Sequence, residues 1–399
     1  MGDEEQAIVR VEPAIANIDA VSWDACANPS ASDSDSGGAH NPFISHAFLS
    51  ALELSGSATP ETGWAAHHLV LEDAQGSTLA CMPCYLKSHS QGEYVFDYGW
   101  ADAFERAGGR YYPKLQTSVP FTPVTGRRLL VPDVPDAVRR EQYLLNASAT
   151  LLDRYKASSL HLTFLTKGEW ERCGNAGLLR RLDRQFHWKN QDFKTFDDFL
   201  GSLTSRKRKL IRRERRDALT NDITIRLLTG DDITETHWDA FYDFYTDTGS
   251  RKWGQPYLTR NFFSLIGESM ADRILLLMCE REGNPIAGAL NFIGGDTLYG
   301  RYWGCLEDHP FLHFEACYYR AIDYAIENGL STVEAGAQGP HKLARGYVPQ
   351  ETYSAHLIAD PSLREAVTDY LDQERMHVAV ENKELARHAP YRSDDSNGA

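Results

Sequence analysis

One short polar segment combines residue types suited to proton transfer and to anion binding. It spans residues 334–346 and reads EAGAQGPHKLARG, with the polar members Glu334, Gln338, His341, Lys342 and Arg345. A carboxylate or a neutral imidazole can remove a proton from a reacting group. Lysine and arginine side chains hold phosphates or carboxylates. We therefore expect Glu334 and His341 to be catalytic, and Gln338, Lys342 and Arg345 to bind substrate.

Each of these residues also has a structural alternative that the sequence leaves open. Glu334 can form an ion pair with one of the two cations that follow it, instead of accepting a proton. His341 can hold the backbone of its own loop. The two cations can pair with Glu315 or Glu351 rather than with a ligand.

The neighbouring elements indicate where this segment lies. Residues 298–305 fit a strand, residues 312–328 have the three-and-four apolar spacing of a helix, and residues 331–335 fit a second strand. This order forms a right-handed parallel crossover, and such units bind ligands beyond the carboxyl ends of their strands. The polar segment is therefore expected at a ligand-binding edge.

The first of these strands supplies three further candidate substrate ligands, namely Arg301, Tyr302 and Trp303. Aromatic side chains on a strand more often belong to a core than to a ligand site, and both roles stay open for Tyr302 and Trp303. An arginine in a strand with aromatic neighbours needs a partner, because arginine is almost never buried unpaired.

A dense run of cations predicts a second functional surface. Residues 206–216 contain eight cations and one acid, a charge of +8 − 1 = +7, in a chain whose net charge is −15. On a helix of about three turns these like charges repel one another. We expect an anionic partner such as a tRNA acceptor stem, a lipid-linked pyrophosphate or CoA phosphates, and the alternative is a clamp onto the acidic remainder of the chain. The cations are Arg206, Lys207, Arg208, Lys209, Arg212, Arg213, Arg215 and Arg216.

Length and composition restrict the class of protein. A chain of 399 residues favours two domains, and no stretch approaches the roughly 20 apolar residues of a membrane helix. The acidic N-terminus lacks the apolar run of a signal peptide, so we expect a cytoplasmic protein without a membrane span, with a monomer as the default. The seven cysteines are scattered, and the CxxC at Cys81 and Cys84 lacks a second pair. We expect buried thiols there and no metal site.

The order of elements predicts an α/β fold. Residues 1–40 form an N-terminal segment with a flexible loop, and residues 41–192 form a first domain of strands and helices. Residues 193–385 repeat that coarse order as a second domain, which a strand and a helix within 353–382 complete. Residues 386–399 form a disordered tail.

Several longer motifs together resemble one family. They are NPF-x-SHAFL at 41–49, YYPKL and PFTP-x-TG-x-RLL within 111–130, SRKRK-x-IRRERR at 205–216, YGRYWG at 299–304 and E-x-GAQG-x-HK-x-x-RG at 334–346. The chain resembles the predicted N-acyltransferase family related to the Fem-type peptidoglycan aminoacyl transferases, within the GNAT acetyltransferase superfamily. The resemblance implies two tandem GNAT-like domains, each a mixed central sheet flanked by helices. It also implies transfer of an acyl or aminoacyl group to an amine.

One departure from the superfamily bears on the acyl donor. Acetyl-CoA-dependent members hold the pyrophosphate on a glycine loop at a helix N-terminus. The equivalent loop at 305–315 reads CLEDHPFLHFE, which has no glycine and carries Glu307 and Asp308. Fem-type enzymes also lack this loop and use aminoacyl-tRNA. We therefore rank aminoacyl-tRNA, or another non-acetyl donor, above acyl-CoA, and expect either to be a co-substrate rather than a tightly bound cofactor.

The expected mechanism is direct attack by the amine in a ternary complex, because the sequence shows no Ser–His–Asp or Cys–His motif. The acceptor is expected to be a small-molecule or peptide amine linked to peptidoglycan precursor modification. The alternative comes from a different class: a non-catalytic module that binds cell-wall precursor or RNA through the basic run.

Overall fold

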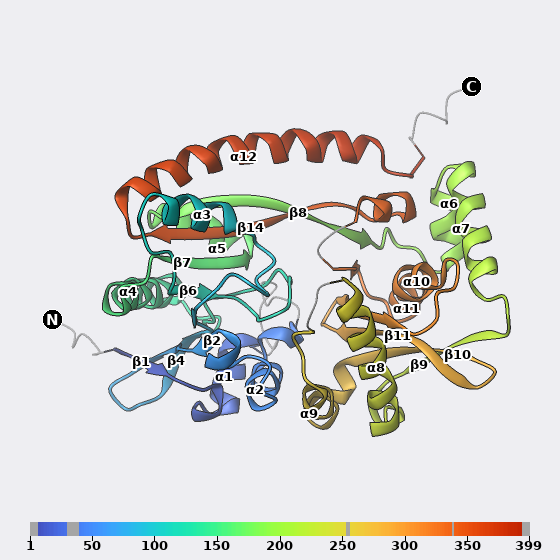
Figure 1. Cartoon of the computed structure of the whole chain (residues 1–399), viewed down its shortest axis with the longest axis horizontal. Helices are drawn as coiled ribbons and strands as arrows, with labels where there is room; N and C mark the ends of the chain where they lie inside the picture. Colours follow the sequence, from blue (N-terminus) through green and yellow to red (C-terminus); the bar gives the residue numbers. More distant parts are fainter. Residues whose placement is uncertain (1–6, 30–39, 253–255, 337–338, 393–399) are drawn as a thin grey trace. The chain divides into compact units, whose positions relative to one another are not determined.

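The computed structural model describes residues 7–29, 40–252, 256–336 and 339–392, and the chain forms two compact units (Figure 1). Unit 1 comprises Met1–Asp183 and Glu351–Val378, and unit 2 comprises Arg184–Gln350 and Ala379–Ala399. The chain thus leaves unit 1 after Asp183, builds most of unit 2, and returns to unit 1 at Glu351.

Unit 1 contains two sheets and is α/β. The smaller sheet is antiparallel, in the order β1 (Ile8–Glu12), β3 (His68–Glu72) and β4 (Thr78–Met82). The larger sheet has the order β2 (Trp64–Ala66), β5 (Tyr85–Lys87), β6 (Lys114–Thr117), β7 (Ser159–Leu165) and β14 (Val348–Ile358). In it β6 and β7 are parallel, and the remaining neighbours are antiparallel. The helices are α1 (Ala20–Ala27), α2 (His46–Leu54), α3 (Tyr98–Arg106), α4 (Ala137–Tyr155), α5 (Lys167–Asn175) and the part of α12 (Pro361–Arg387) before residue 379.

The larger sheet of unit 1 has one leucine-rich face and one polar face. One rung of register partners is Leu86, Leu115, Leu160 and Leu357. The next rung is Tyr85, Gln116, His161 and His356. Because successive residues of a strand point to opposite faces, the two rungs lie on opposite sides of the sheet. The leucine rung contributes to a large hydrophobic cluster of the unit.

Unit 2 is also α/β, with one mixed sheet. The strand order is β8 (Leu179–Lys189), β13 (Thr332–Glu334), β12 (Thr297–Cys305), β11 (Asn284–Ile293), β10 (Ile274–Arg281) and β9 (Ile223–Leu228). The pair β12 and β13 is parallel and the other neighbours are antiparallel, so the predicted crossover is confirmed. The helices are α6 (Phe196–Ser202), α7 (Ser205–Ala218), α8 (Glu235–Lys252), α9 (Arg260–Met270), α10 (Leu312–Phe314) and α11 (Arg320–Glu327).

The crossover helix predicted over 312–328 contains a wider turn. Its central part, Glu315–Tyr319, is π-helical and joins α10 to α11. Single π turns within helices occur frequently at functional sites. Here the turn carries Cys317 and Tyr318, which line the cavity described below.

The compact units differ from the predicted linear domains 41–192 and 193–385. The sequence places the strand and helix within 353–382 in the second domain, whereas residues 351–378 belong to unit 1. The physical reason is pairing and burial: β14 pairs with β7, and Leu363, Val367 and Leu371 of α12 pack with Trp100 and Tyr111.

Two further features concern the state of the cysteines and the apolar character of the helices. All seven cysteines are free, and Cys81 and Cys84 are buried thiols, as predicted. Among the residues that the structure describes, no helix has both the length and the apolar character needed to cross a bilayer.

Candidate active site

A cavity of about 90 Å³ lies in unit 2 and is lined by β11, β12, the crossover helix and the residue after β13. The ladder between β11 and β12 shifts register between Leu290 and Asn291. Such a bulge bends the strand and re-aims its side chains. The lining residues are Ala289, Leu290, Asn291, Gly300, Arg301, Tyr302, Trp303, His313, Cys317, Tyr318 and Ala335. Arg301, Tyr302 and Trp303, predicted from the sequence, therefore all border a cavity.

Glu334 and Arg301 form a buried ion pair beside this cavity. Arg301 Nη2 donates to Glu334 Oε2 at 2.8 Å, and the two side chains are 2% and 8% exposed. Arg301 Nη1 also donates to the Gly300 carbonyl at 2.8 Å. The partner of Glu334 is therefore Arg301, rather than one of the two cations of its own loop.

A buried histidine that the sequence analysis missed completes this cluster. His187 on β8 is the register partner of Glu334, and its Nε2 lies 3.7 Å from Glu334 Oε1 and 3.1 Å from Gln185 Oε1. Burial lowers the pKa of His187, although the Glu334 carboxylate opposes that shift. The polar alternation of Gln185, His187 and Lys189 along β8 was the available signal for a functional strand face.

His341 reaches the cavity through Tyr318. Tyr318 lines the cavity, and its hydroxyl oxygen lies 2.9 Å from His341 Nε2. Partial burial lowers the pKa of His341, and the charges of Arg345 and Lys342 lower it further. His341 is consequently a neutral imidazole near pH 7, the form that can accept a proton.

Lys342 is buried in the same loop. Its Nζ donates to the Gly336 carbonyl at 2.9 Å, and Lys342 is only 1% exposed. Burial, aided by the Arg301 charge, lowers the pKa of Lys342 to about 7. Its charge therefore changes near neutral pH. Gln338, the remaining predicted ligand of this loop, lies outside the described residues.

Arg345 fastens the loop to α7. Its Nη2 donates to both carboxylate oxygens of Glu214, at 2.9 and 3.0 Å, and Nη1 donates to the His341 carbonyl at 2.8 Å. The guanidinium carbon lies 3.5 Å from the centre of the Phe314 ring. The sequence proposes Glu315 or Glu351 as the structural partner, and the structure places Glu214, the single acid within the basic run, in that position.

Helix α7 presents most of the basic run to solvent. Lys207, Arg208 and Arg215 are half-buried, and Arg215 donates to Glu315 at 3.1 Å and to Asp323 at 2.5 Å, which ties α7 to the crossover helix. Arg212 pairs with Asp197, and Arg216 with Asp217. Within the described parts of the chain, no ion pair involves the five remaining cations: Arg206, Lys207, Arg208, Lys209 and Arg213. The run is therefore only partly neutralised within unit 2.

The glycine-free loop after β12 carries its own salt bridges. Glu307 accepts from Arg281 at 2.8 and 2.9 Å and lies 2.8 Å from His309 Nε2. These contacts lower the pKa of Glu307 to about 2. A fixed carboxylate at this position disfavours a bound pyrophosphate.

Two mixed α/β units, one of them with a cavity beside a crossover strand, define the class to which this protein belongs: α/β chains of two units, as predicted. A family model described as peptidoglycan biosynthesis/recognition, FemAB-like, matches residues 14–393. The chain therefore belongs to the FemAB-like family. This membership supports a transferase related to the cell wall.

Two of the solved structures that this chain resembles, each with a TM-score of at least 0.50, agree on the fold. The crystal structure of FemX is 12% identical, covers 88% of this chain and 98% of FemX, and superposes with a TM-score of 0.53. A conserved protein from Bacteroides thetaiotaomicron VPI-5482 is 11% identical, with coverage of 88% and 100% and a TM-score of 0.50. A tandem GNAT protein from the clavulanic acid biosynthesis pathway is 11% identical, with coverage of 89% and 99% and a TM-score of 0.46. No curated protein matches this chain.

Proposed function

We propose that this protein transfers an acyl or aminoacyl group from an activated donor to an amine, and that the cavity of unit 2 holds the reacting groups. The observation that carries this proposal is the cavity wall itself. Arg301 and Tyr318 both line this cavity. Arg301 is paired with Glu334, and Tyr318 is hydrogen-bonded to His341. A fixed positive charge and a neutral base beside one cavity are what attack on a carbonyl needs.

In the proposed reaction the amine nitrogen attacks the carbonyl carbon of the donor, and the carbonyl oxygen becomes an oxyanion. Arg301 stabilises this oxyanion, and Glu334 holds the Arg301 guanidinium in place. The amine proton passes to the Tyr318 oxygen as the Tyr318 hydroxyl proton passes to His341 Nε2. Collapse expels the donor oxygen or sulfur, which takes up the proton that His341 accepted, returned through the Tyr318 hydroxyl, and a new amide remains.

The proposed donor is aminoacyl-tRNA, ranked above acyl-CoA. Two features support this ranking. The loop after β12 offers a fixed carboxylate, Glu307, where a pyrophosphate would need backbone amides. Helix α7 offers exposed cations that suit a nucleic-acid backbone. The proposed acceptor is an amine of a peptidoglycan precursor, in keeping with the family description.

The test is a transfer assay with the full chain. Bulk aminoacyl-tRNA or acetyl-CoA is supplied as donor, with a lysine-containing peptide as acceptor, and the new amide is detected by mass spectrometry. We expect transfer from aminoacyl-tRNA, reduced about 100-fold by His341→Ala through loss of the base. A matched control is His388→Ala, because His388 is also an exposed unit 2 histidine, with its side chain 66% exposed.

Two results would count against the proposal. Transfer from acetyl-CoA alone would overturn the ranking of donors. Binding of tRNA without transfer from either donor, in the wild type, would instead support the non-catalytic binding module.

A further inference from the structure

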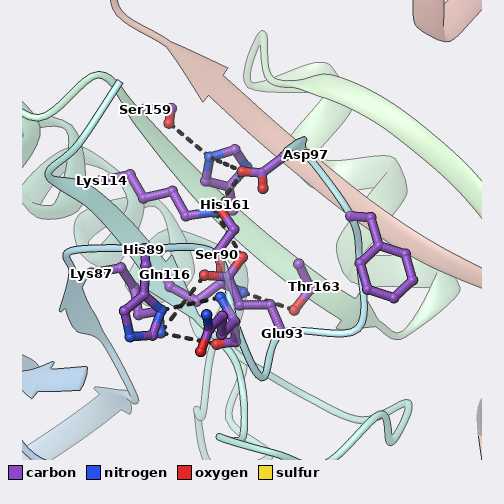
Figure 2. Close-up of polar contacts among 12 residues, drawn as sticks. Lys87, His89, Ser90, Glu93, Asp97, Lys114, Gln116, Ser159, His161 and Thr163 are labelled. Atoms are coloured by element: carbon purple, nitrogen blue, oxygen red, sulfur yellow. Dashed lines mark hydrogen bonds and ion pairs between the residues drawn. The ribbon is translucent and has the colours of Figure 1, made fainter. Parts of the chain in front are cut away.

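A buried polar side chain has a structural role when the chain itself satisfies its hydrogen-bonding groups, and unit 1 contains an example. The ammonium of Lys114 donates to three side chains of segment 88–97 at 2.5–2.8 Å: Ser90, Glu93 and Asp97 (Figure 2). A lysine ammonium has three donors, so this group needs no ligand. A buried polar group that keeps an unused acceptor beside a cavity has a different meaning.

Asn291 is such a group in unit 2. It lies on β11, lines the cavity and is only 1% exposed. Its Nδ2 donates to the Leu275 carbonyl at 3.2 Å and to the Ala289 carbonyl at 3.3 Å. Because both partners are acceptors, they fix which end of the amide carries the hydrogens. The oxygen Oδ1 is therefore the end that remains for another partner.

The Asn291 oxygen lies at the cavity wall without a protein donor. Over residues 7–29, 40–252, 256–336 and 339–392, no N–H or O–H group donates to it. Its register partner Gly300, directly before Arg301 on β12, also lines the cavity. A Cβ at residue 300 would lie 3.2 Å from the Asn291 oxygen, so glycine at this position leaves the oxygen open. Since buried acceptors in proteins are nearly always paired, we expect the ligand of this cavity to supply a donor.

The transfer reaction proposed above leaves Asn291 unused. The attacking amine gives its proton to Tyr318, whose hydroxyl oxygen lies 2.9 Å from His341 and which belongs to the crossover helix rather than to β11. Arg301 takes the carbonyl oxygen of the donor. Because Asn291 pairs with the residue before Arg301, the group that it binds is expected beside the reacting carbonyl. An acetyl group offers no N–H there, whereas an aminoacyl group carries an amine on the carbon next to its carbonyl.

We propose that the Asn291 oxygen accepts a hydrogen bond from the α-amine of an aminoacyl donor and so selects aminoacyl groups over simple acyl groups. This inference rests on the transfer function proposed above and names the donor class of the same cavity. A site that hydrogen-bonds a substrate N–H rejects an analogue without it, because the analogue leaves the buried oxygen unpaired. Asn291 is thus a specificity-determining residue, and it takes no part in the proton transfer.

Two ligands of nearly equal size test this assignment by calorimetry, without requiring turnover. They are 3′-amino-3′-deoxyadenosines acylated on the 3′ nitrogen with glycine or with propionic acid, which mimic the acylated end of a tRNA. The two compounds differ only in an amine in place of a methyl group. We expect the full chain to bind the glycyl compound at least about tenfold more tightly. Asn291→Leu should remove this preference, because it replaces the amide by an apolar side chain of similar size.

Gly300→Ala is a second variant, which removes neither hydrogen bond of Asn291. Its methyl group would lie 3.2 Å from the Asn291 oxygen and 3.3 Å from the Glu334 carbonyl oxygen, and would cover the acceptor. It should therefore also remove the preference for the glycyl compound. The control is Asn190→Ala, which removes an amide of unit 2 whose oxygen accepts from the backbone N–H of Phe193 at 2.8 Å. This control should lower the melting temperature and leave the preference unchanged.

The inference is overturned if the wild type binds both compounds equally or binds neither, because water would then be the partner of Asn291. It is also overturned if the glycyl preference survives Asn291→Leu or, where that variant does not fold, Gly300→Ala. Failure of the proposed function is a separate result, read in the transfer assay. A wild type that selects the glycyl compound but transfers nothing would keep Asn291 as a binding residue and remove the transferase function.

Discussion

At the residue scale, the buried ion pair of Arg301 and Glu334 raises the question whether Glu334 has a structural or a catalytic role. Arg301 lines the cavity, and its Nη2 lies 2.8 Å from Glu334 Oε2. If Glu334 holds Arg301, its loss should affect folding as well as transfer. If Glu334 acts only as a base, its loss should affect transfer alone.

We predict that Glu334→Gln destabilises the protein by about 3–5 kcal/mol, because it removes the carboxylate that pairs with the buried Arg301 charge. Urea-induced unfolding measures this change. The double variant Arg301→Met/Glu334→Leu removes both charges and should recover most of the lost stability. A Glu334→Gln protein with wild-type stability and no transfer activity would instead make Glu334 a catalytic base.

The buried Lys342 side chain predicts that donor affinity depends on pH. Burial holds its pKa at about 7, so the ammonium form is present below that pH and is lost as the pH rises through it. If Lys342 holds an anionic group of the donor, donor affinity should fall roughly tenfold between about pH 6 and about pH 8. Lys342→Arg should remove this dependence, because arginine stays protonated. Equal pH profiles for the two proteins, in fluorescence titrations with tRNA, would exclude this role.

At the scale of elements, α7 separates into a fastening side and a free side. Arg215 and Glu214 hold the crossover helix and the loop after β13, through Glu315 and Arg345 respectively. Arg206, Lys209 and Arg213 share an exposed face at three- and four-residue spacing. The basic run is thus both a structural clamp and an open surface, two roles that the sequence left as alternatives.

We predict that Arg206→Ala/Lys209→Ala/Arg213→Ala weakens tRNA binding and lowers the slope of log affinity against log salt by about 2–3, because three phosphate contacts are lost. Fluorescence anisotropy at several salt concentrations gives this slope. Arg215→Ala serves as the control: it should lower stability, since Glu315 is fully buried. An unchanged slope in the triple variant would place the nucleic-acid surface elsewhere or remove it.

The sequence predicted elements with strong periodicity and missed short ones. The strands and the helix of the crossover have long apolar patterns and lie where expected. Strand β6 and helix α3 lie in a stretch rich in glycine, proline and aromatics, where local signals are weak. The segment that carries the basic run forms two helices, α6 and α7, because Leu203 between them is extended and its side chain is fully buried.

The candidate site was predicted in the same uneven way. Arg301, Tyr302 and Trp303 were singled out because they lie on a strand with a clear pattern, and all three line the cavity of unit 2. Their role as substrate ligands stays a prediction. Their partners were not found, because pairing depends on distant segments. His187 precedes Glu334 by 147 residues (334 − 187) yet is its register partner, and no spacing rule within one segment reveals such a contact.

At the scale of the whole molecule, unit 1 is discontinuous in sequence. Its last strand and the first part of α12 come from residues 351–378. Arg181 donates to both oxygens of Glu374 at 2.8 Å, which fixes α12 to residues of the first segment. The stability of unit 1 therefore depends on a segment that follows the main part of unit 2, residues 184–350.

We predict that a fragment of residues 1–183 alone does not fold, because β7 lacks its neighbour β14 and the cluster around Trp100 stays uncovered. The same fragment joined to residues 351–378 by a flexible glycine–serine linker should fold. Dispersion of amide signals in NMR spectra distinguishes the two. A well-dispersed spectrum for the short fragment would contradict the prediction.

The discontinuity of unit 1 also delays its folding during synthesis on the ribosome. Between Asp183 and Glu351 the ribosome adds 167 residues (350 − 183), which takes roughly 8–33 s at about 5–20 residues per second. Throughout this interval β7 presents an open edge, the kind of surface that recruits other strands. Nascent chains usually fold from the N-terminus, but unit 1 is completed only after most of unit 2 has been made. The order of synthesis therefore exposes unit 1 to holdase chaperones before it can fold.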